Sequence, residues 1–588
     1  MRGPIPAACF APCGRVVCTA RSGHGASGRW RKAPPVVVWL AGPTPSHSKT
    51  SKDAPHDDAI RRALRACTTT ECRRPARRGD RRVAPSTETI PEFLPALEGL
   101  AYVSLRTNAF ESAADAFDRL IALVPQPGAQ ASFDAAMASL QAGRQMRAEA
   151  LFDATVQQSP DVIGTMHTIG LTWAQAGDNA RALGWFERTS AKAPALWQAH
   201  FNRGRALGAL GRYDEEIDAY RLANAIAPQQ PDPLVNLGVA LREQHAFGEA
   251  LQCLREAVKL APDHAGARTN RAQTNLLLGD FEHGWHDYEW RWQEGGQRRR
   301  FSDRLWDGRA PLAGKTVFVH SEPGLGNTLQ FVRFVPRLVE MGANVVLSVQ
   351  APLVTLLGGF ARGVTVLAEH IPVPSFDWQL PLLSLPHLLK AGGDVATALP
   401  YVRSSAGREM IWRSMLGKPQ EGALRVGFVW RTGPFPPHRD VALAHWAPVF
   451  GADAHFYALQ VDVTDDERAE LARYANVHDI GAKLSDFAET AAVMAQMDLV
   501  ISVDTAALHL AGALGKPVWG LVGFTPDWRW QLSRRDSDWY RSLTLYRQSP
   551  RGDWDGLTAQ VGADLATLVH EARAAVPMKA HGYHPASA

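Results

Sequence analysis

The feature that most constrains the fold is a set of four prolines that follow one another at intervals of 34 residues. Pro160, Pro194, Pro228 and Pro262 each end an amphipathic segment. A repeat of this length supplies one pair of helices per copy, and such a pair cannot bury its apolar face alone. The copies are therefore predicted to stack side by side as an α solenoid.

Residue size within the copies supports this interpretation. Small residues recur where two helices must approach closely, and large apolar residues recur in the second helix of each copy. The small residues are Gly170, Gly204 and Gly238 in one helix and Ala148, Ala182 and Ala250 in the other, and the large ones are Phe152, Phe186, Tyr220 and Leu254.

A degenerate copy with Phe110 and Phe117 precedes these four, and the segment LLLGDFEHGWHDYEWRW follows them. The array resembles the tetratricopeptide repeat family over residues 92–293. The resemblance implies a superhelix whose concave groove holds a peptide or a partner protein. The alternative is a spacer or a dimerisation surface, because a repeat pattern specifies architecture and not ligand.

Length and composition indicate a globular chain with two or three domains. The chain has 588 residues, of which 46% are hydrophobic and 21% charged. The formal net charge is only +4, and most of the excess comes from an arginine-rich beginning. A basic face for nucleic acid is therefore not expected.

Residues 1–90 are rich in Arg, Pro, Ser and Gly, which predicts a disordered arm, or a true translation start further along, for example at Val83. Residues 577–588 are expected to be a tail. The apolar run from Val36 to Ala41 is too short for an ordinary signal peptide, and no run is long enough for a transmembrane helix. Five of the six cysteines lie in the arm and only Cys253 lies beyond it. No disulfide framework is expected, and a reducing cytoplasmic location is the simplest expectation.

The pattern changes after residue 312. Short β-branched segments such as TVFVH, NVVLSV, RVGFVW and DLVISV alternate with helical segments, which is typical of parallel sheets covered by helices. Two α/β units are predicted, over residues 312–403 and 424–576, with a break near Ser404–Leu424. The solenoid is expected to join them through a polar, cleavable segment between Gln293 and Leu312.

The stretch HSEPGLGNTLQFVRF places two glycines between a predicted strand and a predicted helix that ends at Gly342. A dinucleotide-binding fingerprint would need a third glycine where this chain has Leu329, and a phosphate-binding P-loop would need a lysine after its second glycine. The glycine pair is therefore either a binding turn of another kind or only a tight turn.

A second segment, LVISVDTAALHLAGALG, predicts a buried strand followed by a small-residue helix that Asp504 caps. The amides of Thr505, Ala506 and Ala507 would then lie at a helix N-terminus, where a diphosphate can bind. His509 lies one turn further on. Alternatively, Asp504 is only a cap and His509 is a buried core histidine.

These segments, together with FYALQ and FTPDWRW, look like the glycosyltransferase half of bacterial tetratricopeptide proteins. That half is similar to the heptosyltransferase family and, more remotely, to protein O-GlcNAc transferases. The resemblance covers most of residues 312–570. It implies a GT-B fold of two Rossmann-like units and transfer of a sugar from a nucleotide-diphosphate donor, with no cofactor and no required metal.

The resemblance also implies roles for single residues. Gly324, Gly326 and Gln330 are expected beside the nucleotide sugar, together with Asp504, Thr505, Ala506 and His509. Arg431 and Arg439 are expected to neutralise the leaving diphosphate.

The family places an aspartate, a candidate base, where this chain has Asn327. An amide cannot take up a proton near neutral pH. His438 and Glu322 are the substitute candidates for the base, and otherwise Asn327→Asp should raise turnover. The tryptophans Trp528 and Trp539 either wall the nucleotide pocket or pack the closing helix.

Three functions remain open from the sequence. The first is a glycosyltransferase acting on an acceptor, expected to be a protein, that the repeats present. The second is a non-catalytic adaptor of the same fold, suggested by Asn327 and the altered loop from Arg431 to Asp440. The third is a glycosyltransferase for envelope glycans, in which the repeats serve assembly.

Overall fold

The computed structural model describes residues 90–124, 126–293, 303–392, 400–418, 423–432 and 439–574. The predicted arm before Ile90 and the predicted tail lie outside these residues. The chain forms two compact units that divide between Ala227 and Pro228. Each unit is described separately.

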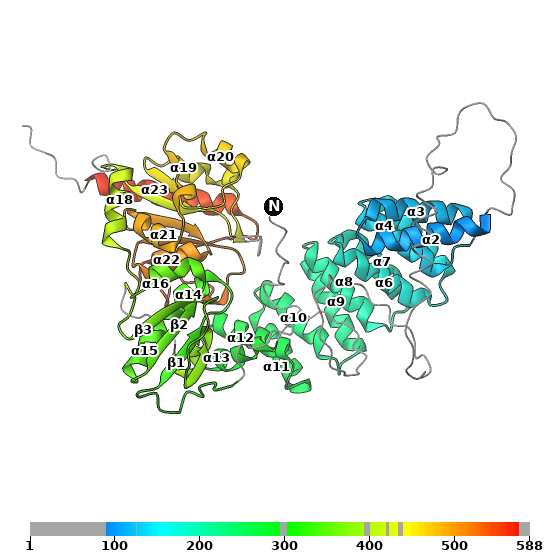
Figure 1. Cartoon of the computed structure of the whole chain (residues 1–588), viewed down its shortest axis with the longest axis horizontal. Helices are drawn as coiled ribbons and strands as arrows, with labels where there is room; N and C mark the ends of the chain where they lie inside the picture. Colours follow the sequence, from blue (N-terminus) through cyan, green and yellow to red (C-terminus); the bar gives the residue numbers. More distant parts are fainter. Residues whose placement is uncertain are drawn as a thin grey trace, which may run out of the picture. The chain divides into compact units, whose positions relative to one another are not determined.

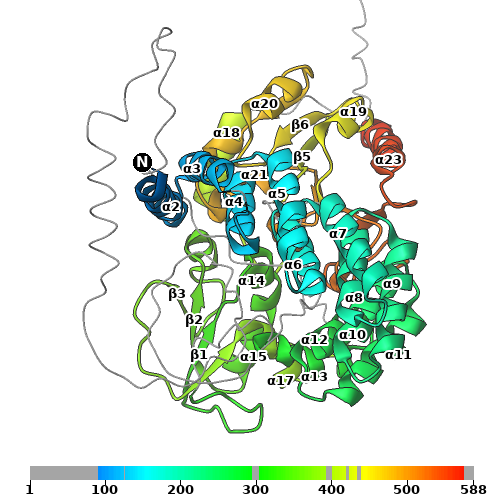
Figure 2. The ribbon, with the colours of Figure 1, turned by 90° about the vertical axis from the view of Figure 1, so that its right-hand side faces the viewer.

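The first unit consists of antiparallel helix pairs stacked along one direction (Figures 1 and 2). This is the predicted solenoid architecture. Its helices are α2 (Ile90–Arg106), α3 (Phe110–Leu123), α4 (Ala129–Gln141), α5 (Gln145–Gln158), α6 (Val162–Gln175), α7 (Asn179–Lys192), α8 (Trp197–Ala209) and α9 (Tyr213–Ile226).

Glycines allow the two helices of a pair to approach closely. A Cβ added to Gly170 in α6 would lie 2.6 Å from the Phe186 ring of α7, and one added to Gly204 in α8 would lie 2.7 Å from the Tyr220 ring of α9. Real Cβ atoms do not approach other atoms so closely. The small and large residues of the 34-residue pattern therefore interlock as predicted.

The second unit begins with two further helix pairs of the same kind. A Cβ added to Gly238 would lie 2.7 Å from Cγ of Leu254. Gly238 therefore packs against Leu254 as Gly204 packs against Tyr220. These helices are α10 (Pro231–Glu243), α11 (Phe247–Leu260), α12 (Ala265–Leu277) and α13 (Phe281–Tyr288), followed by the 3-10 turn η2 (Glu289–Trp292).

A four-stranded parallel sheet follows, in the order β3-β2-β1-β4. The central strand β1 is the predicted TVFVH, and the glycine turn follows its carboxyl end. The strands are β1 (Thr316–His320), β2 (Asn344–Val349), β3 (Val364–Ala368) and β4 (Trp378–Pro381), and the helices are α14 (Leu325–Phe331), α15 (Val335–Glu340), α16 (Val354–Leu357) and α17 (Leu385–Leu388).

The second sheet has six parallel strands in the order β10-β9-β8-β5-β6-β7. The strand order reverses between β5 and β8, and such a switch point opens a crevice at the carboxyl ends of the strands. The strands are β5 (Arg425–Val429), β6 (His455–Ala458), β7 (Val477–Asp479), β8 (Leu499–Val503), β9 (Val518–Val522) and β10 (Leu543–Arg547), and the helices are α18 (Ala406–Leu416), α19 (Ala447–Phe450), α20 (Asp465–Leu471), α21 (Phe487–Met494), α22 (Ala506–Ala513) and α23 (Trp554–Ala574).

The last helix pairs share a hydrophobic core with the sheets. Trp285 of α13 is 2% exposed and lies edge-on to Trp528 at 5.3 Å, to Phe331 at 6.2 Å and to Trp539 at 6.4 Å. We expected the segment between Gln293 and Leu312 to separate the repeats from the sheets as two domains. Burial of this tryptophan instead joins α13 to both sheets, so that cutting the join would expose a core. The sequence limits 92–293, 312–403 and 424–576 themselves stay predictions.

An ion pair strengthens the same connection. Arg291 of η2 donates two hydrogen bonds of 2.8 Å to Glu322, the second residue after β1. Glu322 also accepts from the backbone amide of Leu383 at 3.0 Å. A buried bidentate pair fixes geometry, because removing one partner leaves an uncompensated charge.

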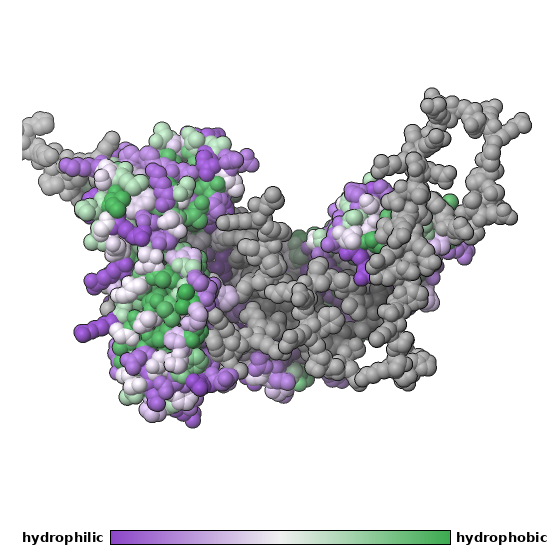
Figure 3. All heavy atoms as spheres, viewed as in Figure 1, coloured by the Kyte–Doolittle hydropathy of each residue, from purple (hydrophilic) through white to green (hydrophobic). Residues whose placement is uncertain are grey.

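On the face that Figure 3 shows, polar side chains surround hydrophobic ones that gather on the sheet region around α16 and at α18. Met410, Ile411 and Met415 of α18 are exposed. Across the described residues, every helix is too short or too polar to cross a bilayer.

Candidate functional site

The glycine turn after β1 and the N-terminus of α22 meet where the two sheets face each other. Gly324 adopts φ +99°, which L side chains rarely adopt. A Cβ on Gly326 would lie 2.7 Å from Cδ2 of His509 on α22. The glycine pair therefore serves a backbone turn and a close approach between α14 and α22.

Helix α22 begins differently from the prediction. Thr505 is its N-cap, without a side-chain cap bond, and its hydroxyl instead pairs with Ser502 at 3.0 Å. Asp504 does not cap the helix, so that part of the prediction is wrong. Its carboxylate instead forms an ion pair with the Arg439 guanidinium, at a distance of 2.8 Å.

Arg439 starts a chain of charged contacts that crosses from one sheet to the other. Its second terminal nitrogen lies 3.2 Å from Asp527 in the loop after β9. Asp527 also pairs with Arg529 at 2.8 Å, and Arg529 donates at 2.7 Å to the side-chain oxygen of Asn327. Arg529 further donates to Gln330 of α14. The two sheets are thus connected through alternating acids and arginines.

Burial and these charges separate the pKa values of the two aspartates. Burial raises the pKa of Asp504, although the nearby Arg439 opposes this shift. Burial alone would also raise the pKa of Asp527, but Arg529 and Arg439 outweigh it and lower the pKa to about 2. Asp527 is therefore the firmly charged partner of the two arginines.

His509 is a buried and hydrogen-bonded histidine. Its Nδ1 shares a bond of 2.9 Å with the Tyr540 hydroxyl, and its ring stacks on Trp530 at 5.3 Å. Its Nε2 lies 4.0 Å from Asp504. Burial holds the pKa of His509 well below its usual range, so the ring is neutral near pH 7. These contacts fit the core-histidine alternative as well as a site residue.

The three residues expected to act in catalysis, Asn327 and the two candidate bases Glu322 and His438, lie in different surroundings. The Asn327 amide is held at both ends, because it accepts from Arg529 and donates to the Pro323 carbonyl at 2.7 Å. Glu322 is held by Arg291. His438 lies outside the described residues. All three roles stay predictions.

The two predicted phosphate-binding arginines separate. Arg439 lies beside Asp504, whereas Arg431 is held by Glu467 of α20 at 2.7 Å and by Asp462 at 2.8 Å. The short spacing between them in sequence suggested one common site. In the structure, Arg431 instead forms its ion pairs with acidic residues in and beside α20.

Sequence reasoning missed Asp527 and Arg529, although the quoted segment FTPDWRW contains both. Only Trp528 of this segment was considered, as a wall of the nucleotide pocket or as a packing residue. It lies in the shared core against Trp285, as in the packing alternative. The available signal was an Asp-x-Arg pair five residues after β9, a strand that neighbours β8. Such pairs are common, so the pattern alone has low specificity.

A small pocket lies beside this cluster, lined by Arg439, Asp504, Asp527 and the loop that follows β9. Its volume is about 10 Å³, which is roughly the space that one water molecule needs. The Arg439 side chain bridges its two acidic walls.

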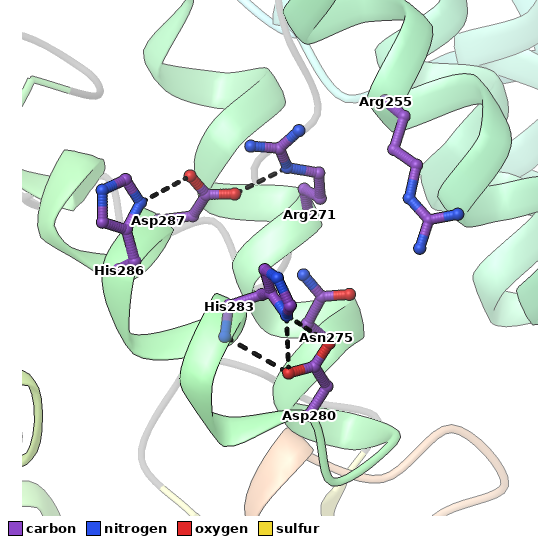
Figure 4. A pocket seen from close by; sticks show the side chains of 7 residues that line it. All are labelled: Arg255, Arg271, Asn275, Asp280, His283, His286 and Asp287. Atoms are coloured by element: carbon purple, nitrogen blue, oxygen red, sulfur yellow. Dashed lines mark hydrogen bonds and ion pairs between the residues drawn. The ribbon is translucent and has the colours of Figure 1, made fainter. Parts of the chain in front are cut away.

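A larger cavity of about 210 Å³ lies among α11, α12 and α13. It is lined by Arg255, Arg271, Asn275, Asp280, His283, His286 and Asp287 (Figure 4). In Figure 4, Arg271 and His286 turn toward Asp287, while His283 turns toward Asp280. The exposed Arg255 extends into the cavity from α11. The side chains resemble a binding surface for a polar or acidic group more than a catalytic centre.

No group of His, Cys, Asp and Glu side chains suited to a metal ion occurs among the residues that the structure describes. Within the same residues, Cys253 forms no disulfide bond.

Two family models match the chain. The tetratricopeptide repeat model matches residues 97–163, 169–231 and 235–283. The model of glycosyltransferase family 9 (heptosyltransferase) matches residues 461–558, which contain β8, α22 and the Asp527–Arg529 segment. The match does not extend to the first sheet.

A similar curated protein is FlbA of Caulobacter vibrioides, which is 24% identical over 509 residues, covering 81% of this chain and 79% of the relative. Similar solved structures include YrrB, described as a tetratricopeptide protein with an unusual peptide-binding site, at 21% identity. It covers 31% of this chain and 96% of its own, with a TM-score of 0.24.

MamA of Desulfovibrio magneticus is 18% identical and covers 28% of this chain and 97% of its own, with a TM-score of 0.25. With these TM-scores, the structural likeness is too weak to argue from. The family matches are the informative result: they identify tetratricopeptide repeats within residues 97–283 and a match to glycosyltransferase family 9 within residues 461–558.

Proposed function

We propose that this protein transfers a sugar from a nucleotide-diphosphate donor to an acceptor that the repeats present, and that its two sheets form a GT-B arrangement. The match to glycosyltransferase family 9 supports the activity class. The observation that carries the proposal is the convergence of Arg439, Arg529 and the N-terminus of α22 at the switch point of the second sheet.

The donor diphosphate would lie at the start of α22. The amides of Thr505 and Ala506 supply donors there, and the helix dipole favours an anion. Arg439 would leave Asp504 and turn toward the phosphates. This exchange also enlarges the pocket, which at about 10 Å³ is too small for a nucleotide.

The chemistry requires stabilisation of a leaving group. The acceptor oxygen bonds to the anomeric carbon and gives up its proton to a base or to solvent. The bond from that carbon to the diphosphate oxygen breaks, and the nucleoside diphosphate departs with the electron pair. Arg439 and the α22 amides would stabilise this charge, as preorganised donors do in other group transfers. We expect no metal requirement, so that turnover persists in EDTA.

Calorimetry with UDP, GDP and ADP tests the donor site. Arg439→Ala should weaken binding of the preferred nucleotide by about tenfold to a hundredfold, since a charge-assisted bond is lost. Arg431→Ala is the matched control, because it also follows β5 but pairs with Glu467. Equal effects of the two variants, or unchanged affinity after Arg439→Ala and Thr505→Val in folded protein, would refute this placement.

The acceptor side rests on the repeats. We propose that the cavity among α11, α12 and α13 contributes to acceptor binding through Arg255 and Arg271. Arg255→Glu should then lower transfer to the acceptor while nucleotide affinity stays unchanged. Intact-mass comparison of proteins from cells with and without this chain would distinguish a protein acceptor from an envelope glycan. If only glycans change, the envelope alternative is correct.

One specific observation favours the adaptor alternative. Asn327 and Glu322 are both held by arginines, which leaves neither of them poised as a base. A wild-type protein that binds nucleotide but neither hydrolyses nor transfers any sugar would favour the adaptor.

A further inference from the structure

The turn between the two helices of each repeat contains one residue with left-handed backbone. This residue is glycine at positions 143, 177, 211 and 279, with φ between +76° and +84°, and it is Asn108, with φ +59°, between α2 and α3. The glycine positions follow the 34-residue period, which passes through position 245 between α10 and α11. There the chain has His245, with φ +61°.

A histidine at this position has an energetic cost. The left-handed region brings the Cβ atom close to the backbone, and glycine avoids this strain. Strained residues persist where the surroundings hold them, and they concentrate at functional sites. The repeat fold does not require the imidazole, because glycine forms the same turn in four other copies and Asn108, a small residue that tolerates this backbone, forms it in the first.

The His245 ring makes its contacts with the sheet domain. It stacks on Phe524 with a centroid distance of 4.1 Å and an angle of 2°, and its Nε2 donates to the Phe524 carbonyl at 3.1 Å. Phe247 packs on the imidazole at 5.2 Å. Burial lowers the pKa of His245, which keeps the ring neutral as it stacks.

The end of α10 reinforces this contact. A helix leaves its last carbonyl groups without partners inside the helix. The Glu243 carbonyl accepts from the Thr525 hydroxyl at 3.2 Å and also from Arg551, whose guanidinium lies 4.9 Å above the Phe524 ring. The His245 side chain therefore holds Phe524, and the Glu243 carbonyl at the same repeat turn holds the adjacent Thr525.

Phe524 and Thr525 belong to the loop that follows β9, which we call the donor-pocket loop (Gly523–Asp527). The loop lines the small pocket with Arg439 and Asp504. Its last residue, Asp527, pairs with Arg439 and Arg529. The position of this loop therefore sets the position of the arginines that face the donor.

We propose that His245 is a positioning residue that anchors the donor-pocket loop to the repeats and thereby tunes nucleotide binding. This inference rests on the proposed donor site. It assigns to one repeat turn a role that the other copies do not have.

The variant His245→Gly in the full-length chain separates the two roles of this residue. It restores the residue that four other turns use, so the unfolding temperature should stay equal or rise. Affinity for the preferred nucleoside diphosphate should fall by about fivefold to twentyfold, because ordering of the loop must then come from the ligand. Phe524→Ala should lower it similarly, and Phe524→Tyr should retain it.

Gly177→His is the control, because it adds the same backbone strain at a turn whose glycine has open space around it. It should lower the unfolding temperature without changing nucleotide affinity. The double variant His245→Gly with Phe524→Ala should bind no worse than either single variant, since both remove one interaction.

Hydrogen exchange of the segment 519–531 distinguishes failure of this inference from failure of the proposed function. Faster exchange in His245→Gly, with a wild type that binds none of the three nucleotides, would retain the anchor and overturn the donor site. A nucleotide-binding wild type with unchanged affinity and unchanged exchange in both His245→Gly and Phe524→Ala would overturn the anchor.

Discussion

The repeats α6–α9 and the repeats α10–α13 follow the same sequence pattern but belong to different parts of the molecule. In both, a glycine of one helix receives a large side chain of the next, as Gly204 receives Tyr220 and Gly238 receives Leu254. The former lie in a solenoid unit, whereas the latter share a unit with two parallel sheets. The periodic signal therefore specifies how a pair folds and not what it packs against.

The difference resides in residues that the repeat pattern does not require. Trp285 enters the core of the sheets, Arg291 pairs with Glu322, and His245 stacks on Phe524. Together they make the last two pairs a structural part of the glycosyltransferase region.

The largest expected effect comes from Trp285→Ala. Truncating a buried tryptophan typically costs about 3–5 kcal/mol. Because Trp285 contacts Trp528 and Phe331, the sheet region should lose stability and nucleotide binding together. Thermal unfolding and calorimetry measure the two effects.

Trp173→Ala is the matched comparison, since Trp173 of α6 is 0% exposed in the solenoid unit. It should lower the unfolding temperature of the repeats while nucleotide affinity remains. Loss of binding in both variants would show that the two sets of repeats do not differ as described.

A second large effect is expected for Glu322→Gln. The amide can still accept from Leu383, but the buried Arg291 then keeps only Glu289 as a counter-ion, and loss of a buried pair costs up to about 3–5 kcal/mol. Turnover per folded molecule should change little. A stable variant with turnover reduced about a hundredfold or more would instead identify Glu322 as the base.

An intermediate result is expected for Asn327→Asp. From the sequence alone, this change should supply a base and raise turnover. In the structure, residue 327 contacts Arg529, which would pair with the new carboxylate, lower its pKa and weaken it as a base. Turnover should therefore rise far less than the roughly hundredfold to ten-thousandfold that a positioned base supplies. A rise of that size would restore the sequence-based prediction.

The smallest effect concerns pH. The pKa of His509 is lowered in the folded protein, so between that value and about 6.5 the unfolded chain binds more protons. Acidification below pH 6.5 should therefore favour unfolding, by up to about 1.4 kcal/mol per pH unit for this one group. His509→Gln should show a shallower dependence in urea unfolding between pH 7.5 and 5.5. Parallel curves for wild type and variant would contradict the assigned neutral state.

Much of the fold could be predicted from the sequence because its signals are periodic. The 34-residue interval, the Gly170 and Phe186 sizes, and strands such as β1, β5 and β8 required only local patterns. The strands β3, β4, β7 and β10 were not predicted; β4 and β7 are short, and β4 ends in a proline. A short strand is determined by its pairing with neighbouring strands more than by the pattern of its own residues.

The candidate site was harder to predict because its contacts join distant segments. Arg529 meets Asn327 across 202 positions of sequence, and the pattern of neither segment reveals the other. Asp504 looked like a helix cap because its preference for that position is strong. Its ion pair with Arg439 prevailed in the structure.

The central claim is that the last two repeat pairs are part of the glycosyltransferase region. The most direct measurement compares two shortened chains, one that begins at Pro228 and one that begins at residue 303, by thermal unfolding and by nucleotide calorimetry. The first should unfold cooperatively and bind the preferred nucleoside diphosphate as the full chain does. The second should be unstable and fail to bind, because it lacks Trp285, Arg291 and His245. A stable chain from residue 303 with the affinity of the full chain would contradict the claim.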